Sequence, residues 1–276
     1  IMAKEGKRAL VQKPENEQIT FDEFKQIIAQ LRAKDGCPWD REQTHESLRQ
    51  CMLEEAYEAA DAIDMKDMEN LKEELGDMML QVMLHAQIAE ENGEFTLADI
   101  IDGIGRKMIR RHPHVFGSAR ADSAGDVLVS WEEIKKQEKH EAGAADGMKR
   151  VAKALPANIR AQKVQKKAAA VGYDFADTNE VLQKVHEELE ELENAMQSED
   201  HRAVEEEFGD LMFSMINLSR FLKVNAENSL TNATEKFINR LDSVENLARE
   251  RRKALTDMSV EALDKLWEEV KEQEHL

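Results

Sequence analysis

The acidic stretch E-E-A-Y-E at residues 54–58 is followed by E-E-L-G-D at residues 73–77. In the second half of the chain, E-E-L-E-E at residues 187–191 is followed by E-E-F-G-D at residues 206–210. Each half therefore has the form E-E-x-x-E, then E-x-x-D, and the second copy lies 133 residues after the first with identical internal spacing. This recurrence predicts a duplicated domain.

Other segments repeat with the acidic ones. K-M-I-R-R at residues 107–111 resembles K-F-I-N-R at residues 236–240, and W-E-E-I-K-K-Q-E at residues 131–138 pairs with W-E-E-V-K-E-Q-E at residues 267–274. The offsets of the repeated segments vary from 129 to 136 residues, which indicates that loops differ in length while helices agree. We expect one domain at residues 1–142 and a second at residues 148–276, with a linker in A-G-A-A-D-G at residues 142–147.

The composition favours an all-α fold. Of 276 residues, 41% are apolar but only 5% aromatic, and 12 Gly and 4 Pro are too few for the many turns of a β-sandwich or barrel. Apolar residues recur at helical spacing, as in Phe24, Ile27, Ile28 and Leu31 after the capping box Thr20-Phe-Asp-Glu23. Further helices are expected at about residues 44–64, 68–92, 97–112, 131–141, 178–197, 199–225, 231–253 and 259–274. The class is thus tandem helical bundles.

The charge limits the partners. A net charge of −19 argues against nucleic acid as the main partner, because binding phosphates along a strand needs a basic face. No apolar run approaches the roughly 20 residues that cross a bilayer, so no membrane partner is expected. Two cysteines without a C-x-x-C pattern favour a reducing cytoplasm.

The paired carboxylates predict metal sites. Residues three apart lie on one helix face, so Glu55 and Glu58 point the same way, as do Glu74 and Asp77. Antiparallel packing would bring four carboxylates together, and their repulsion needs bound cations to offset it. Oxygen ligands of this kind favour Mg²⁺, with Mn²⁺ as a second choice. The same reasoning predicts a site from the matching residues of the second half: Glu188, Glu191, Glu207 and Asp210.

At these residues the chain resembles the MazG family of nucleoside triphosphate pyrophosphohydrolases, within the all-α NTP pyrophosphatase superfamily. The first half also carries C-P-W-D-R-E-Q-T-H (residues 37–45) and R-R-H-P-H-V-F-G (residues 110–117), and the second carries V-G-Y-D-F (residues 171–175). The resemblance implies helical domains, dimers and Mg²⁺-dependent cleavage of NTPs or dNTPs between the α and β phosphorus atoms. The products are a monophosphate and pyrophosphate, and the role is clearance of the nucleotide pool. The eight carboxylates are then both metal ligands and catalytic residues.

Candidate substrate-binding residues surround these motifs. Trp39 and Phe175 are candidates for stacking on the base, with a hydrophobic plug at the end of the bundle as the alternative. Cations on a following helix are candidates for contacting the triphosphate, with ordinary solvated charge as the alternative: Lys107, Arg110 and Arg111 in the first half, Lys236 and Arg240 in the second.

Three other functions compete with this hypothesis. A specific dUTP, dCTP or phosphoribosyl-ATP pyrophosphatase would share the same superfamily and differ only in substrate. A di-iron carboxylate bundle needs E-x-x-H pairs, which His85, His186 and His201 do not provide at the required spacing. A non-enzymatic acidic scaffold would not be stabilised by metal.

Overall fold

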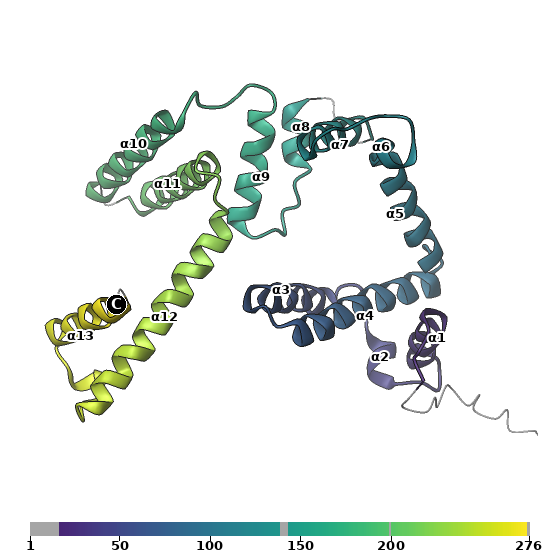
Figure 1. Cartoon of the computed structure of the whole chain (residues 1–276), viewed down its shortest axis with the longest axis horizontal. Helices are drawn as coiled ribbons and strands as arrows, with labels where there is room; N and C mark the ends of the chain where they lie inside the picture. The colour runs from purple at the N-terminus through teal and green to yellow at the C-terminus, as the bar shows by residue number, and fades with distance from the viewer. Residues whose placement is uncertain (1–16, 139–142, 199, 275–276) are drawn as a thin grey trace, which may run out of the picture. The chain divides into compact units, whose positions relative to one another are not determined.

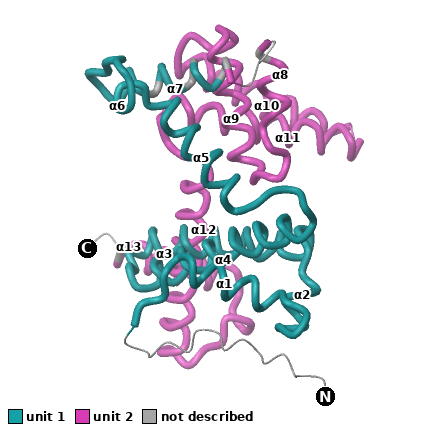
Figure 2. Tube along the Cα trace, turned by 90° about the vertical axis from the view of Figure 1, so that its right-hand side faces the viewer, with its two compact units in different colours: residues 1–135 teal, residues 136–276 magenta. Residues whose placement is uncertain are grey.

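The computed structural model describes residues 17–138, 143–198 and 200–274 (Figure 1). Residues 1–16 of the expected first domain, and the start of the expected linker, lie outside these ranges. Within them the chain forms helices and no strand, which confirms the all-α prediction. The chain divides into two compact units, residues 1–135 and 136–276 (Figure 2).

Unit 1 is built around two long helices that form a hairpin. Its elements are α1 (Phe21–Arg32), α2 (Pro38–Glu42), α3 (Arg49–Met65), α4 (Met68–Asn92), α5 (Leu97–Arg111), α6 (Pro113–Phe116) and most of α7 (Ala124–Glu138). Between α3 and α4 the chain reverses at Lys66, which has a left-handed φ of 58°, and the Asp67 carboxylate then accepts hydrogen bonds from the backbone N–H groups of Glu69 and Asn70. This tight turn sets α3 antiparallel to α4 and their acidic motifs side by side.

A small hydrophobic core supports this hairpin. Ile28 of α1 and Leu48 before α3 are almost completely buried, and they cluster with Met83 and Leu84 of α4 and with Leu97 of α5. The core lies along the second half of α4, whereas Glu74 and Asp77 lie in its first half. The acidic motif therefore remains accessible while the rest of the helix is anchored.

Unit 2 repeats the hairpin with a different surrounding. Its elements are α8 (Ala144–Lys149), α9 (Ala157–Ala169), α10 (Thr178–Gln197), α11 (His201–Phe221), α12 (Ala226–Glu250), the 3₁₀ helix η1 (Leu255–Asp257) and α13 (Val260–Glu274). The α10–α11 pair corresponds to α3–α4, and α9 packs against α11. A second core of Val244, Ala248, Leu266 and Val270 joins α12 to α13.

Local signals explain where the structure departs from the expected elements. Residues 38–42 form the short helix α2, which is not among the expected helices, because Pro38 at its first position has a φ suited to a helix. Part of the expected linker forms α8. Helix α3 begins at Arg49 rather than near Thr44, because Thr44 and Ser47 hydrogen-bond each other's backbone N–H groups in a preceding turn.

Candidate functional site

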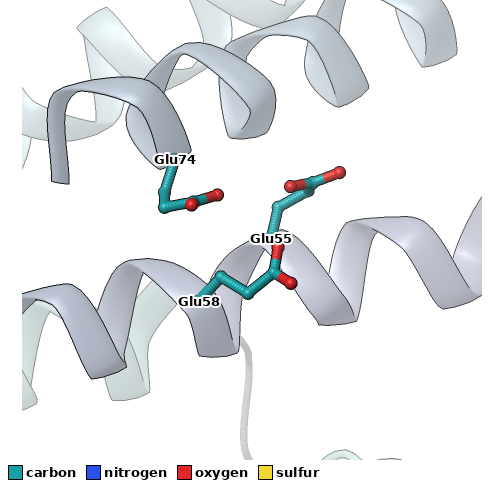
Figure 3. A group of neighbouring side chains, drawn as sticks. All are labelled: Glu55, Glu58 and Glu74. Carbon is teal, nitrogen blue, oxygen red and sulfur yellow. The ribbon is translucent and has the colours of Figure 1, made fainter. Parts of the chain in front are cut away.

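Three carboxylates converge in unit 1. Glu55 and Glu58 project from α3 toward Glu74 of α4, into the space between the two helices (Figure 3). One oxygen from each of the three lies within 4.8 Å of the others. The oxygens around an octahedral Mg²⁺ are about 3–4 Å apart, so small side-chain rotations would close this group around a cation. Asp77, the fourth predicted residue, lies outside this group of three.

Electrostatics nevertheless connect Asp77 to the others. Burial is the main cause that raises the pKa of Glu55, followed by the charges of Asp77 and Glu58, and a side-chain hydrogen bond with Gln81 opposes them. Burial also raises the pKa of Glu74, followed by the charges of Glu58 and Asp77. Glu55 and Glu74 therefore resist ionisation, in part because of the charges of the neighbouring carboxylates. A bound cation would offset the electrostatic repulsion between these carboxylates.

Unit 2 brings together a matching set. Oxygens of Glu188, Glu207 and Asp210 lie within 4.8 Å of one another. Glu188 is only 6% exposed, and its Oε2 is buried without a hydrogen-bond partner among the described residues. Its Oε1 forms an ion pair with Lys184 Nζ at 2.7 Å. Glu191 lies outside the group of three, but burial and the Glu188 charge raise its pKa.

Both sets suit a hard divalent cation. They offer only oxygen ligands, and Glu188, which has an oxygen within 4.8 Å of two further carboxylates, leaves its buried Oε2 without a hydrogen-bond partner among the described residues. The two units differ in which repeat position stands outside the group, Asp77 in one and Glu191 in the other. Together they show that every one of the four repeat positions can contribute to such a cluster.

A cavity of about 610 Å³ adjoins the carboxylates of unit 2. Glu188 and Asp210 line it, and so does Phe175, one of the two aromatic residues predicted to stack on a base. Val181 and Phe213 add apolar surface. A volume of this size is typical of small-molecule sites, which pair an apolar wall with a few polar groups.

Polar residues that the sequence analysis missed also line this cavity. Arg220 of α11 donates to both carboxylate oxygens of Asp174, with Nη1 to Oδ2 at 2.9 Å, and thereby ties the loop before α10 to α11. Gln165 of α9 is buried and donates from Nε2 to the carbonyl of Phe213 at 2.8 Å. Asp174 belongs to the V-G-Y-D-F motif, so the sequence could have identified it as a candidate. Arg220 and Gln165 have no local signal, because their partners lie 46 and 48 residues away.

The predicted cations of unit 1 lie on α5. Arg111 is buried with its guanidinium 5.2 Å from the Trp131 ring centre, Lys107 is half-buried and Arg110 is exposed. Helix α5 follows the C-terminal end of α4, whereas the carboxylates lie in the first half of α4. The fold of unit 1 by itself does not bring these cations to the carboxylates. Trp39 is 60% exposed on α2.

The predicted cations of unit 2 lie on α12. Lys236 is exposed, and Arg240 is half-buried with its guanidinium 5.9 Å from the Trp267 ring centre. Helix α12 starts at the end of α11, and its C-terminal part packs against α13 (Figure 1). These two cations therefore belong to the α12–α13 pair rather than to the lining of the cavity.

Two glycines lie inside helices beside the acidic motifs, Gly76 in α4 and Gly209 in α11. A Cβ placed at either would meet nothing within 4 Å, so no other segment of the described chain requires a glycine there. Both glycines face open space in the single chain. None of the described helices has the length and apolar character needed to cross a membrane.

Comparison with known proteins agrees with this geometry. Residues 43–116 and 177–245 match the family model of the MazG nucleotide pyrophosphohydrolase domain. The two matches contain the α3–α4 and α10–α11 hairpins with all eight predicted carboxylates, and they confirm that the helical domain is duplicated.

Full-length relatives extend the similarity beyond the two domains. The nucleoside triphosphate pyrophosphohydrolase/pyrophosphatase MazG of Thermotoga maritima is 46% identical over 92% of this chain and 96% of its own length. The nucleoside triphosphate pyrophosphohydrolase of Escherichia coli K12 is 40% identical over 92% of this chain and 98% of its own. The uncharacterized protein YabN of Bacillus subtilis is 47% identical over 92% of this chain, which spans only 52% of that protein. With two domain matches and such relatives, the chain belongs to the MazG nucleotide pyrophosphohydrolase family.

Proposed function

We propose that this chain is a Mg²⁺-dependent nucleoside triphosphate pyrophosphohydrolase that releases a nucleoside monophosphate and pyrophosphate and so clears the nucleotide pool. The observation that carries the proposal is the recurrence, in both units, of carboxylate oxygens within 4.8 Å of one another. In unit 2 this cluster borders a cavity of nucleotide size. The names of the relatives from T. maritima and E. coli support the same reaction class.

The proposed metal ligands are the eight carboxylates of the two motifs. They are Glu55, Glu58, Glu74 and Asp77 in unit 1, and Glu188, Glu191, Glu207 and Asp210 in unit 2. Bound Mg²⁺ would supply positive charge for the phosphate oxygens and acidify a water molecule. A carboxylate in each set that does not bind metal would be available to accept a proton from the attacking water. Mn²⁺ satisfies the same oxygen ligands.

The cavity of unit 2 is the proposed nucleoside pocket. Phe175 presents an aromatic ring for stacking on a base, beside the apolar surface of Val181 and Phe213. The Asp174–Arg220 ion pair holds the Phe175 loop against α11. Lys184 fixes Glu188, since its ammonium lies 2.7 Å from Glu188 Oε1. The base would therefore lie in the cavity while the triphosphate reaches the carboxylates at its edge.

Product identification tests this reaction. The protein is incubated with each NTP and dNTP in Mg²⁺, and the products are separated by anion-exchange chromatography. Monophosphate and pyrophosphate are expected, whereas diphosphate and orthophosphate would overturn the proposal. A strong preference for dUTP or dCTP in the same panel would identify a base-specific enzyme of this superfamily.

We also propose that the chain works as a homodimer in the cytoplasm. Phe208, Met212 and Met215 leave a row of exposed apolar side chains on α11, and Leu75 and Met79 do the same on α4. Such contiguous apolar surface favours burial against a second copy. Light scattering after size exclusion should give twice the chain mass of 31.5 kDa, and Met212→Lys should shift it toward the monomer. Both cysteines are free, which suits a reducing compartment.

A further inference from the structure

Unit 2 has a second hollow, of about 450 Å³, along the first half of α9. Three cationic side chains line it, Lys149 at the end of α8, Lys153 in the following loop and Arg160 in α9. We call this hollow the basic groove. No carboxylate is among its lining residues, although the chain as a whole carries a net charge of −19.

None of the three cations of the basic groove forms an ion pair with a carboxylate of the described residues. No side-chain hydrogen bond or ion pair of the described residues engages Lys149, Lys153 or Arg160, whereas other cations of this unit, such as Lys184, are paired. Three like charges around one hollow repel one another. Lys149 and Lys153 are exposed to water, which weakens this repulsion, and a bound anion would reduce it further.

Arg160 provides an independent sign of a missing partner. Its Nε is buried from solvent and has no hydrogen-bond acceptor. A buried donor on a charged group is unfavourable when it is left unpaired, because it has lost its water without gaining a replacement. Oxygen atoms of a bound anion are the natural acceptors for a guanidinium group.

The N-terminal end of α9 adds partial positive charge to the basic groove. Pro156 precedes the helix and provides no side-chain cap, so the first backbone N–H groups have no side-chain acceptor. Ala157 and Ala161, from the first turns, line the basic groove. The N-terminal end of a helix carries a partial positive charge and is a common place for phosphate groups.

We propose that the basic groove binds a small phosphorylated anion, separately from the carboxylate sites. Its volume lies in the range of small-molecule sites, and only three cations serve it, which suits phosphate, pyrophosphate or a nucleoside monophosphate rather than a nucleic acid. Glu188 and Asp210 line the larger cavity and not the basic groove. The two hollows share Met148, Val164 and Phe213 among their lining residues, so they adjoin each other at these apolar side chains.

Binding without metal tests this site. The full chain, freed of divalent ions on a chelating resin, is titrated by calorimetry with sodium pyrophosphate, sodium phosphate and AMP in turn. The acidic carboxylate sites repel these anions when no metal is present, so saturable binding reports the basic groove. We expect one anion per chain, with an affinity that falls as salt is raised. Absence of saturable binding of all three anions would overturn the proposal, and because no turnover is measured, that result leaves the proposed enzymatic activity untouched.

Charge-removing variants locate the binding. Lys153→Gln and Arg160→Gln should each weaken the affinity about tenfold, as expected for one lost and partly solvated charge contact. Lys163→Gln removes an exposed lysine of the same helix outside the groove and should change nothing. Circular dichroism checks folding, and the exposed Lys153 keeps the test valid if the Arg160 variant unfolds. Equal affinity in all three variants would overturn the assignment.

The preferred anion identifies the source of the ligand. Tighter binding of pyrophosphate than of AMP supports retention of a released product, whereas tighter binding of AMP or phosphate supports recognition of a phosphate group from another source. Either preference supports a phosphate site in the basic groove.

Discussion

Replacing Glu188 with Gln separates a metal ligand from a structural ion pair. Glu188 is 6% exposed, pairs with Lys184 at 2.7 Å through Oε1, and lies within 4.8 Å of oxygens of Glu207 and Asp210. Gln keeps the size of the side chain and an oxygen that accepts a hydrogen bond from Lys184. It removes the charge, so it changes both the attraction and the repulsion at this position.

The two electrostatic effects of Glu188→Gln nearly cancel when no metal is bound. At an effective dielectric constant of 20, attraction at the Lys184 distance is roughly 6 kcal/mol, and repulsion from Glu207 and Asp210 is roughly 3.5 kcal/mol each. Water reduces both effects because Lys184 is 34% exposed and Asp210 is exposed. The free energy of unfolding without metal should therefore change by less than about 1 kcal/mol.

With Mg²⁺ the same variant should behave very differently from the wild type. A cation at about 100 times its dissociation constant stabilises the fold by about 2.7 kcal/mol per site, and Glu188→Gln should lose this stabilisation in unit 2. Denaturant unfolding with and without Mg²⁺ measures it, and calorimetry should show fewer ions bound per chain. The matched control is Glu193→Gln, which removes the charge of an exposed glutamate on the same helix. Undiminished Mg²⁺ binding and stabilisation in Glu188→Gln, or a loss of several kcal/mol without metal, would refute the reasoning.

Three further changes test other parts of the structure. Burial and neighbouring carboxylates raise the pKa of Glu55 above 4.5. Lowering the pH from neutral through that raised pKa should therefore weaken Mg²⁺ binding to unit 1 and stabilise the metal-free form of unit 1. Calorimetry and denaturant unfolding at several pH values measure these two effects, and a pH-independent affinity for Mg²⁺ would contradict the prediction. Burial and the neighbouring His45 lower the pKa of His85 below 6.5, so the folded state favours the neutral ring; the stability that this provides is present above the His pKa of the unfolded chain and is lost as the pH falls through the lowered pKa of the folded state. His85→Gln should therefore reduce the loss of stability between about pH 7 and 5, as measured by denaturant unfolding. An unchanged dependence of stability on pH would argue against this assignment. Arg220→Met leaves Asp174 unpaired and should cost about 1–3 kcal/mol of stability while raising KM more than it lowers kcat; denaturant unfolding and steady-state kinetics decide, with a normal KM as the opposing result.

Features that depend on near neighbours in sequence were predictable. The bounds of α4 match the expected residues 68–92, since Asp67 caps its start and Gly93, with a φ of 72°, ends it. The pairing of Glu55 with Glu58 on one face follows from the helical period alone. Where the local signal was overlooked, the bounds were less accurate: α12 begins at Ala226 because Asn225 caps it, five residues before the expected start.

Tertiary structure alone decided what surrounds the carboxylates. The exclusion of Asp77 from one group and of Glu191 from the other depends on side-chain directions across two packed helices, which spacing along a single helix does not fix. Arg220 meets Asp174, and Gln165 meets Phe213, only because α9 and the loop before α10 pack against α11. The sequence by itself thus determined the helices, their duplication and the chemistry of the acidic motifs, because these follow from short-range periodicity and residue type. The cavity, the basic groove and the choice of converging oxygens follow from packing between distant segments, which no local pattern encodes.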